Sequence, residues 1–287
     1  MTIPKIIHQL APIDKNKWHP LWEPCQNSWK TAFLNFEYKL WDDDSIDIFI
    51  QEEYPEYCNM YDELPTHIMK LDFVRFAILH KFGGIYADMD MFCYMNFYHE
   101  FGKPTCYVVE NPYGNDPIEN SLLASIPNHK FWIQCMELSL SRHNDIKKNK
   151  TDYFNDISKI STDTENGTLI RPFLVFHITG TNLISTVYRK NKYEIGVFPG
   201  HLYNNNYISY HPKFRTKHIH TGLWGKENIE IKEKRPELYN KLNDISIEEF
   251  DFYIDYSNGN FLRTNILDVD KNSYETELNT NSVIKYT

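Results

Sequence analysis

Two carboxylates separated by a single residue follow a glycine break and a short apolar run. Asp88 and Asp90 come after Gly83, Gly84 and residues 85–87, which we expect to form a strand. The carboxyl end of a strand is where α/β sheets bind their ligands. Carboxylate oxygens suit Mg²⁺ or Mn²⁺, and such a cation can neutralise the charge of a diphosphate. A solvated acidic turn is the simpler interpretation of the pair taken alone.

A second pair of charges lies in the segment before the glycines. Residues 66–82 predict a long helix that ends at Gly83. At 100° per residue, one face of this helix is apolar and comprises Ile68, Leu71, Ile78, Leu79 and Phe82. Asp72 and Arg75 project from the middle of that face, where burial is expected. Two interpretations stay open: a structural ion pair at spacing i, i+3, or recognition of a sugar hydroxyl by an acceptor and a forked donor.

The elements around these charges predict an α/β fold. Expected strands cover residues 3–10, 36–41, 85–87, 106–109, 121–126 and 193–198, and expected helices cover residues 20–33, 42–50, 66–82, 129–142 and 181–189. The opening alternation of strand and helix predicts a single, mainly parallel sheet flanked by helices. Residues 144–167 are polar and predict a surface excursion, and the polar tail from residue 267 is expected to be poorly ordered.

Composition and charge limit which binding partners and which cellular compartment we expect for this protein. The formal net charge of −9 argues against binding to a nucleic-acid backbone, which requires clustered Lys and Arg. The five cysteines are odd in number and widely spaced, which indicates neither a disulfide framework nor a zinc ribbon. No apolar run reaches the length of a signal peptide core or of a membrane span. We therefore expect a soluble, cytoplasmic enzyme without an integral membrane segment.

Several separated segments resemble the family-32 glycosyltransferases, which include yeast-type mannosyltransferases and capsular-polysaccharide enzymes; a more distant likeness is to the large clostridial glucosylating toxins. In chain order the matching segments are IPKIIHQ at 3–9, LDFVRFAILHKFGGIYADMD at 71–90, IENSLLASIPNHKF at 118–131, TGTNL at 179–183 and HIHTGLW at 218–224. The resemblance implies a GT-A fold with a catalytic domain over residues 1–225. Residues 226–287 would then be a small C-terminal appendage.

The same resemblance implies the chemistry. It implies transfer of a sugar from a nucleotide-sugar donor to a hydroxyl of a glycan or other acceptor, with retention of configuration and with Mn²⁺ or Mg²⁺. A UDP-sugar is the preferred donor, and a GDP-sugar is the alternative. Asp72 and Arg75 would grip the transferred sugar. Asp88 would face the sugar or ribose and reach the metal through water, and Asp90 would ligate the metal; these four are the expected catalytic residues.

Further donor contacts are implied at positions that match the family's motifs. Besides Asp72, Arg75 and Asp88, the expected donor-binding residues are His8, Gln9, Leu10, Tyr86, Asn120 and Trp224. The closing segment departs from relatives, which often have His followed by Ser-Trp. His220 is the expected third metal ligand beside Asp88 and Asp90, and Trp224 is expected to donate its indole N–H to a diphosphate oxygen. A surface histidine and a packed aromatic are the alternatives for these two.

Nothing in the sequence resembles a serine or cysteine triad, so we expect front-face substitution without a covalent intermediate. Two other functions are compatible with an aspartate pair. A Mg²⁺-dependent nucleotidyltransferase commonly carries a Gly-rich or Lys-containing phosphate loop, which this sequence lacks. A carbohydrate- or nucleotide-binding protein without turnover would not require Asp72, Arg75, Asp88 and Asp90 together.

Overall fold

A six-stranded sheet forms the centre of the computed structural model, which describes residues 2–111, 116–148, 173–204 and 213–221 and four short strands at residues 164–165, 168–169, 252–255 and 260–263. The sheet order β2-β1-β3-β6-β5-β9 comprises β1 (Ile6–Leu10), β2 (Glu37–Trp41), β3 (Gly84–Ala87), β5 (Cys106–Glu110), β6 (Ile118–Ser125) and β9 (Gly196–Phe198). β6 runs antiparallel to both of its neighbours, and the other pairs are parallel. The predicted α/β fold with a single, mainly parallel sheet is confirmed.

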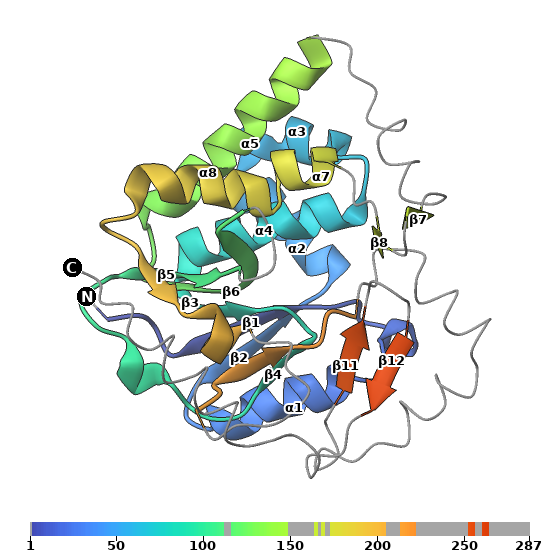
Figure 1. The fold of residues 1–287 in the computed structure, drawn as a ribbon. Helices are drawn as coiled ribbons and strands as arrows, with labels where there is room; N and C mark the ends of the chain where they lie inside the picture. The colour runs from blue at the N-terminus through green and yellow to red at the C-terminus, as the bar shows by residue number, and fades with distance from the viewer. Residues whose placement is uncertain are drawn as a thin grey trace.

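Helices cover both faces of this sheet (Figure 1). One face carries the helical layer of α2 (Asp43–Glu53), α3 (Cys58–Glu63), α4 (His67–Phe82), α5 (Lys130–Lys148), α7 (Phe173–Ile178) and α8 (Thr181–Asn191). The other face carries α1 (Trp22–Ala32), α9 (Gly200–Tyr203) and a small antiparallel pair, β4 (Met91–Cys93) with β10 (Thr216–His218). Each face has its own buried apolar cluster, so the sheet is the shared middle layer.

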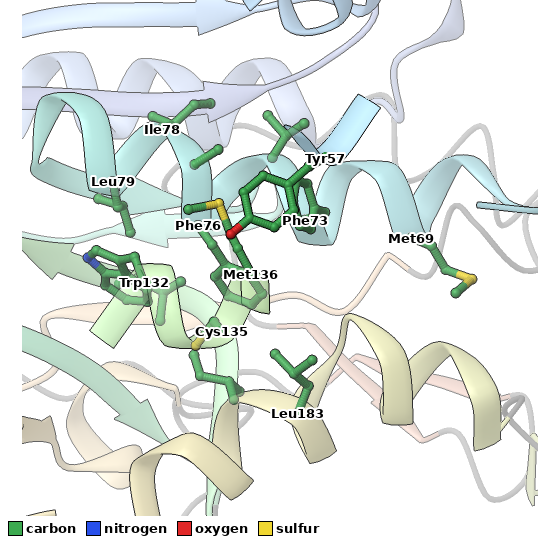
Figure 2. Close-up of a cluster of buried hydrophobic side chains, with 14 of the residues drawn as sticks. Tyr57, Met69, Phe73, Phe76, Ile78, Leu79, Trp132, Cys135, Met136 and Leu183 are labelled. Atoms are coloured by element: carbon green, nitrogen blue, oxygen red, sulfur yellow. The ribbon is translucent and has the colours of Figure 1, made fainter. Parts of the chain in front are cut away.

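Helix α4 is buried on almost every side in its middle turns. The prediction of one apolar face was too narrow, because Phe73, Val74, Phe76 and Ala77 are also fully buried. One cause is α5, which packs against α4 beside the sheet, with Phe76 stacked on Trp132 at 6.0 Å between ring centroids (Figure 2). A helix enclosed between a sheet and a second helix buries more than one stripe.

Two glycines join α4 to β3 and fix the direction in which β3 leaves. Gly83 and Gly84 adopt φ values of +64° and +90°, backbone conformations that residues other than glycine rarely adopt. A Cβ atom at Gly83 would lie 2.6 Å from the carbonyl oxygen of Ser125, and one at Gly84 would lie 2.7 Å from that of Ile6. The predicted glycine break is confirmed, and it delivers Asp88 at the carboxyl end of β3.

The small β4–β10 pair brings the end of the described chain back to this point. Met91 pairs with His218, and the N–H of Ile219 donates to the carbonyl oxygen of Asp90 at 3.0 Å. Trp29 of α1 supports the pair from below, because its indole N–H donates to the Met91 carbonyl oxygen at 2.8 Å. Residues more than a hundred positions apart in the sequence therefore become neighbours beside the aspartate pair.

Several boundaries differ from the expected ones. Helix α5 continues to Lys148, into the segment expected as a surface excursion, and the sheet strand near residue 193 begins only at Gly196. Residues 149–163, Trp224 and the tail from residue 267 lie outside the described residues. Within the segment expected to form the C-terminal appendage, the structure describes β11 (Phe252–Asp255) and β12 (Asn260–Arg263), which form an antiparallel pair. All five cysteines are free, as expected, and none of the described helices is long and apolar enough to cross a bilayer.

Candidate active site

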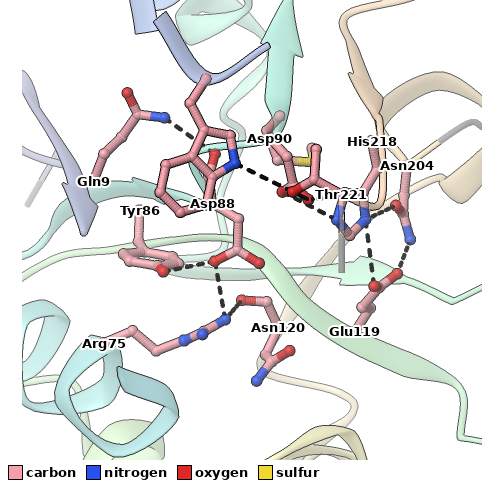
Figure 3. Close-up of polar contacts among 12 residues, drawn as sticks. Gln9, Arg75, Tyr86, Asp88, Asp90, Glu119, Asn120, Asn204, His218 and Thr221 are labelled. Carbon is pink, nitrogen blue, oxygen red and sulfur yellow. Dashed lines mark hydrogen bonds and ion pairs between the residues drawn. The ribbon is translucent and has the colours of Figure 1, made fainter. Parts of the chain in front are cut away.

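Asp88 lies where β3 ends and is held from three sides. Its Oδ1 accepts a hydrogen bond from Tyr86 Oη at 2.6 Å and lies 3.2 Å from Arg75 Nη1 (Figure 3). Its backbone N–H donates to the Ser121 carbonyl oxygen at 2.9 Å, and its own carbonyl oxygen accepts from Gln9 Nε2 at 3.1 Å. A quarter of the Asp88 side chain remains exposed. The carboxylate is therefore fixed in direction but still accessible to a ligand.

Arg75 connects the two pairs of charges that the sequence singled out. Its Nη2 lies 2.8 Å from Asp72 Oδ1, and its Nη1 donates to the Asn120 carbonyl oxygen at 2.8 Å while facing Asp88. The guanidinium also lies over the Tyr86 ring, with 4.9 Å between its central carbon and the ring centroid. Both interpretations of the Asp72–Arg75 pair are compatible with this geometry, since the ion pair forms and its partners line a cavity.

Asp72 is a buried carboxyl group with several donors. It accepts from Asn120 Nδ2 at 2.9 Å and from Thr179 Oγ1 at 3.4 Å in addition to its contact with Arg75. Burial raises the pKa of Asp72 above its ordinary value, and the charge of Arg75 opposes that rise. Burial also opposes the charge of Arg75, but the surrounding carboxylates, Asp88 first, raise the pKa of its guanidinium above the ordinary value.

A histidine connects Asp90 to a second acidic residue. His218 Nε2 lies 3.4 Å from Asp90 Oδ1, and His218 Nδ1 lies 3.3 Å from Glu119 Oε1. The other oxygen of Asp90 accepts from the backbone N–H of Thr221 at 2.8 Å and from its hydroxyl at 3.1 Å. Asn204 donates to Glu119 and faces His218 Nδ1 with its Oδ1 at 3.1 Å. Both ring nitrogens of His218 therefore have polar partners that orient the imidazole.

The charges in this cluster depend on one another. Burial opposes the charge of His218, but the carboxylates of Asp90 and Glu119 raise its pKa to about 10. Burial likewise opposes ionisation of the two acids, but His218 holds the pKa of Asp90 well below its usual range and that of Glu119 at about 2. An imidazolium therefore balances the two carboxylates in the absence of another cation.

The residues present fit a divalent cation. Ligand atoms of Asp88, Asp90 and His218 all lie within 4.8 Å of one another, and a small adjustment would bring them around one ion. Two carboxylates and an imidazole suit Mn²⁺. His220, the expected third ligand, falls instead in a neighbouring group with Glu119 and His218. Both histidines belong to the segment expected to supply the third ligand, and the geometry groups His218 with the two aspartates; which histidine ligates a metal stays a prediction.

His8 is fully buried and does not line the cavity. Trp41 Nε1, which can only donate, lies 3.2 Å from His8 Nδ1, so this nitrogen accepts and the other ring nitrogen donates to the Gly83 carbonyl oxygen at 3.0 Å. Burial lowers the pKa of His8 to about 4. These contacts give His8 a structural role between β1 and the glycine turn, and its expected position beside a nucleoside stays a prediction.

Gln9 and Leu10, the next two residues of β1, differ in their relation to the cavity. Gln9 is also buried; it accepts from Tyr38 Oη at 2.6 Å and donates to the backbone of Asp88, so it positions that residue. Leu10 lines the cavity, as expected of a donor-binding residue. Gln9 thus reaches the site only through the main chain of Asp88.

One cavity of about 500 Å³ collects most of the expected site. Its polar part is lined by Asp72, Arg75, Asp88, Asp90, Asn120 and His220, together with Tyr86, Glu119, His218 and Thr221. Its apolar part includes Leu10, Trp22, Trp41 and Leu71. Such a cavity can hold a ligand with a flat or apolar end and a charged, hydroxyl-bearing end. Trp224 lies outside the described residues.

Sequence reasoning missed His218, Glu119, Thr179 and Thr221 as parts of this site. His218 stands in the same segment as His220, and Glu119 directly precedes Asn120. Alternation along the strand gives the only signal for His218, because Thr216 and His218 share one face of β10. The contact between Glu119 and His218 depends on the position of β10 relative to β6, which no local pattern encodes.

Part of the chain is similar in sequence to known glycosyltransferases. Residues 20–108 match the family described as a glycosyltransferase sugar-binding region containing DXD motif. Inositol phosphoceramide mannosyltransferase 3 of Schizosaccharomyces pombe is 35% identical over 46% of this chain and 36% of its own length. An uncharacterized glycosyltransferase, L373, of Acanthamoeba polyphaga mimivirus is 34% identical over 50% of this chain and 58% of its own length. These matches confirm the resemblance to DXD-containing glycosyltransferases, and the chain spans about a third to just over half of these relatives.

Among solved structures, the chain is similar to PaToxG glycosyltransferase, with 14% identity, a TM-score of 0.44 and coverage of 66% of this chain and 70% of that one. A glycosyltransferase involved in glycosylation of the major capsid of PBCV-1 has 10% identity, a TM-score of 0.43 and coverage of 83% of this chain and all of that one.

Proposed function

We propose that this chain is a glycosyltransferase that moves a hexosyl group from a nucleoside-diphosphate sugar to a hydroxyl acceptor with the help of Mn²⁺ or Mg²⁺. The observation that carries the proposal is the meeting of the buried Asp72–Arg75 pair with Asp88, Asp90 and His218 at one cavity. The matched family region, residues 20–108, includes the Asp72–Arg75 ion pair as well as Asp88 and Asp90 and adds support.

The Asp72 end of the cavity suits the transferred sugar. A carboxylate that accepts and a guanidinium and amide that donate can read neighbouring hydroxyls of a ring. Their mutual contacts hold Asp72, Arg75 and Asn120 in place before a ligand arrives. Such preorganisation lowers the entropic cost of orienting the reacting carbon.

The Asp90 end suits the diphosphate. Asp88, Asp90 and His218 would hold the cation, which would supply positive charge to the departing diphosphate. Thr221 and the Ile219 N–H fix Asp90 from two sides, and Glu119 and Asn204 fix His218. Ligands oriented by such partners bind a metal more tightly than free ones.

Front-face substitution with retention remains our proposal for the stereochemical course. The carboxylates of Asp72, Asp88, Asp90 and Glu119 each contact a cationic side chain, which weakens any of them as a nucleophile. The proton of the attacking hydroxyl would pass to the departing diphosphate. Capture of a glycosyl group bonded to the protein during turnover would contradict this course.

Two nucleotide sugars should be tested first as donors. A UDP-linked hexose is the donor that we prefer, and GDP-mannose follows because several relatives are named as mannosyltransferases. Those names also include inositol phosphoceramide, so a glycolipid headgroup with free hydroxyls belongs among the acceptors beside simple glycans.

The test of the proposal is metal-dependent donor consumption. Purified protein is incubated with UDP-hexoses or GDP-mannose, with Mn²⁺ or with a chelator, and the released nucleoside diphosphate is measured. We expect release only with metal, and we expect Asp90→Asn to reduce it by about 100-fold or more. Asp62→Asn, at an exposed position on α3, is the matched control and should retain the wild-type rate.

Equal turnover by wild type and Asp90→Asn would contradict the site. Release of pyrophosphate from a nucleoside triphosphate and a sugar phosphate would instead identify a nucleotidyltransferase. Metal-dependent nucleotide binding without release from any donor would support a binding protein.

A further inference from the structure

A second group of metal ligands lies beside the aspartate pair and shares one residue with it. Ligand atoms of Glu119, His218 and His220 lie within 4.8 Å of one another, as do those of Asp88, Asp90 and His218. The second group offers two imidazoles and one carboxylate, whereas the aspartate group offers one imidazole and two carboxylates. Imidazole-rich sets favour Zn²⁺, and carboxylate-rich sets favour Mn²⁺ and Mg²⁺. The second group therefore favours Zn²⁺ over Mn²⁺ more strongly than the aspartate group does.

His218 faces the two groups with different ring nitrogens. Its Nε2 lies 3.4 Å from Asp90 Oδ1, and its Nδ1 lies 3.3 Å from Glu119 Oε1 (Figure 3). Two ligands of a tetrahedral zinc ion, each about 2.0–2.1 Å from the metal, lie about 3.4 Å apart. Both separations match that spacing, so each pair can share an ion with little side-chain movement.

One imidazole cannot serve both groups at once. A neutral imidazole has a lone pair on one ring nitrogen and a proton on the other. If Nε2 ligates an ion with the aspartates, Nδ1–H donates to Glu119 or Asn204. If Nδ1 ligates an ion with Glu119 and His220, Nε2–H donates to Asp90. Occupation of either group therefore removes His218 from the other.

The backbone holds His220 in place for this second group. His220 has a φ of +55°, a left-handed conformation that costs a residue with a Cβ about 1–2 kcal/mol. Hydrogen bonds on both sides maintain it, from Ile219 N–H to the Asp90 carbonyl oxygen and from Thr221 N–H to Asp90 Oδ2. The His220 ring lies against the His218 ring with 3.6 Å between centroids and 30° between the ring planes, so the His220 side chain must rotate for both imidazoles to ligate one ion.

We propose that Glu119, His218 through Nδ1 and His220 form a second cation site that takes Zn²⁺, and that its occupation excludes the cation held by Asp88, Asp90 and His218. Asn204 Oδ1, 3.1 Å from the same nitrogen, is a further oxygen ligand in reach. The site itself stands on the ligand geometry alone. Its consequence, inhibition of sugar transfer by Zn²⁺, rests on the proposed function.

Titrations with Zn²⁺ alone and with Mn²⁺ alone test the site without any sugar donor. Calorimetry, or competition with a coloured chelator, gives the Zn²⁺ affinity, and the electron paramagnetic resonance signal of free Mn²⁺ gives the Mn²⁺ affinity. We expect His220→Asn to weaken Zn²⁺ binding by at least about tenfold and to leave Mn²⁺ binding within about threefold of wild type. Asp88→Asn should show the reverse pattern.

Asparagine is the replacement at position 220 because it tolerates left-handed φ values, so the turn should survive. X-ray absorption of the zinc-loaded wild type provides a readout that needs no variant. We expect two imidazole ligands per zinc, and we expect one in His220→Asn. A single imidazole in wild type, or parallel loss of both metals in the two variants, would overturn the proposal. Neither result depends on sugar transfer, so a failed transfer assay would count against the proposed function alone.

Discussion

Arg75 shows at the scale of single residues why a charged group can lie in a packed helix. The guanidinium is 3% exposed, yet it faces Asp72, Asp88 and the Asn120 carbonyl oxygen, and it lies on the Tyr86 ring. A buried charge is tolerated only where such partners replace water. Because one of these partners is a ligand-accessible carboxylate, the cost of burial is coupled to the function of the site.

Replacement of Asp72 by Asn should separate sugar recognition from nucleotide binding. Asp72→Asn keeps the shape but loses the charge that Arg75 and Asn120 contact, which corresponds to about 1.5–3 kcal/mol for a charge-assisted contact. We expect kcat/KM for the donor to fall by about 10- to 100-fold while the Kd of free UDP changes by less than about threefold. Kinetics and calorimetry measure the two quantities. An equal loss of both would place Asp72 at the nucleotide.

His8 should make stability depend on pH. Burial lowers its pKa from 6.5 to about 4, so between these values the unfolded chain binds a proton that the folded chain does not. The stabilisation is complete above pH 6.5 and is lost as the pH falls toward 4, by up to about 3 kcal/mol. Urea unfolding at several pH values measures it.

The control for this titration is His8→Asn, which keeps one acceptor and one donor but cannot titrate. Other buried histidines, such as His19, contribute in both proteins and cancel in the comparison. The variant should lose less stability than wild type over this pH range. Identical pH dependence in the two proteins would show that His8 is not the responsible group.

At the scale of elements, the unit from α4 through the glycines to β3 sets the distance between the two charge pairs. Asp72 and Arg75 project from α4, and Asp88 follows β3 directly. The chain must reverse within two residues, and the space beside the turn is filled by backbone atoms of residues 125–127. The geometry of the site therefore depends on the glycines as much as on the charges.

An alanine at Gly83 should destabilise the fold strongly. The added Cβ would lie 2.6 Å from a backbone oxygen in a left-handed conformation, and backbone cannot move aside easily. We expect a loss of about 2–4 kcal/mol in the free energy of unfolding, measured by urea denaturation. Gly102→Ala is the matched control, because its nearest neighbour would be at 3.7 Å, and it should change stability by less than about 1 kcal/mol. Equal stability of the two variants would contradict the steric argument.

At the scale of the whole molecule, the cavity lies between layers that come from distant parts of the chain. β1 and β3 bring their carboxyl ends to it, β6 brings Glu119 and Asn120, and β10 brings His218 from the other face of the sheet. A ligand that binds there contacts residues of β1, β6 and β10 at once. Its binding should therefore stabilise the entire fold.

Thermal unfolding should report this stabilisation. At a nucleotide concentration 100 times its Kd, binding adds about 2.7 kcal/mol, which corresponds to a rise in Tm of about 5–10 °C for a chain of this size. We expect UDP or GDP with Mn²⁺ to produce the rise and a chelator to abolish it. Asp90→Asn should lose the metal-dependent part. A nucleotide-induced shift of the same size without metal would contradict a cation at Asp88 and Asp90.

Local sequence patterns were sufficient to predict the features that depend on a short stretch of chain. Helical periodicity placed Asp72 and Arg75 in a buried face, and the glycine pair predicted where α4 ends and β3 begins. The alternation of strands and helices predicted the mainly parallel sheet. Each of these follows from propensities that act within one or two turns of chain.

The distant residues that complete the cluster could be identified only from the folded chain. The pairing of Met91 with His218 selected His218 over His220 as the neighbour of both aspartates, and the antiparallel insertion of β6 brought Glu119 to the same imidazole. Packing against α5 likewise buried α4 on a second side. These outcomes depend on strand register and helix contact between segments far apart in the chain, and no local pattern carries that information.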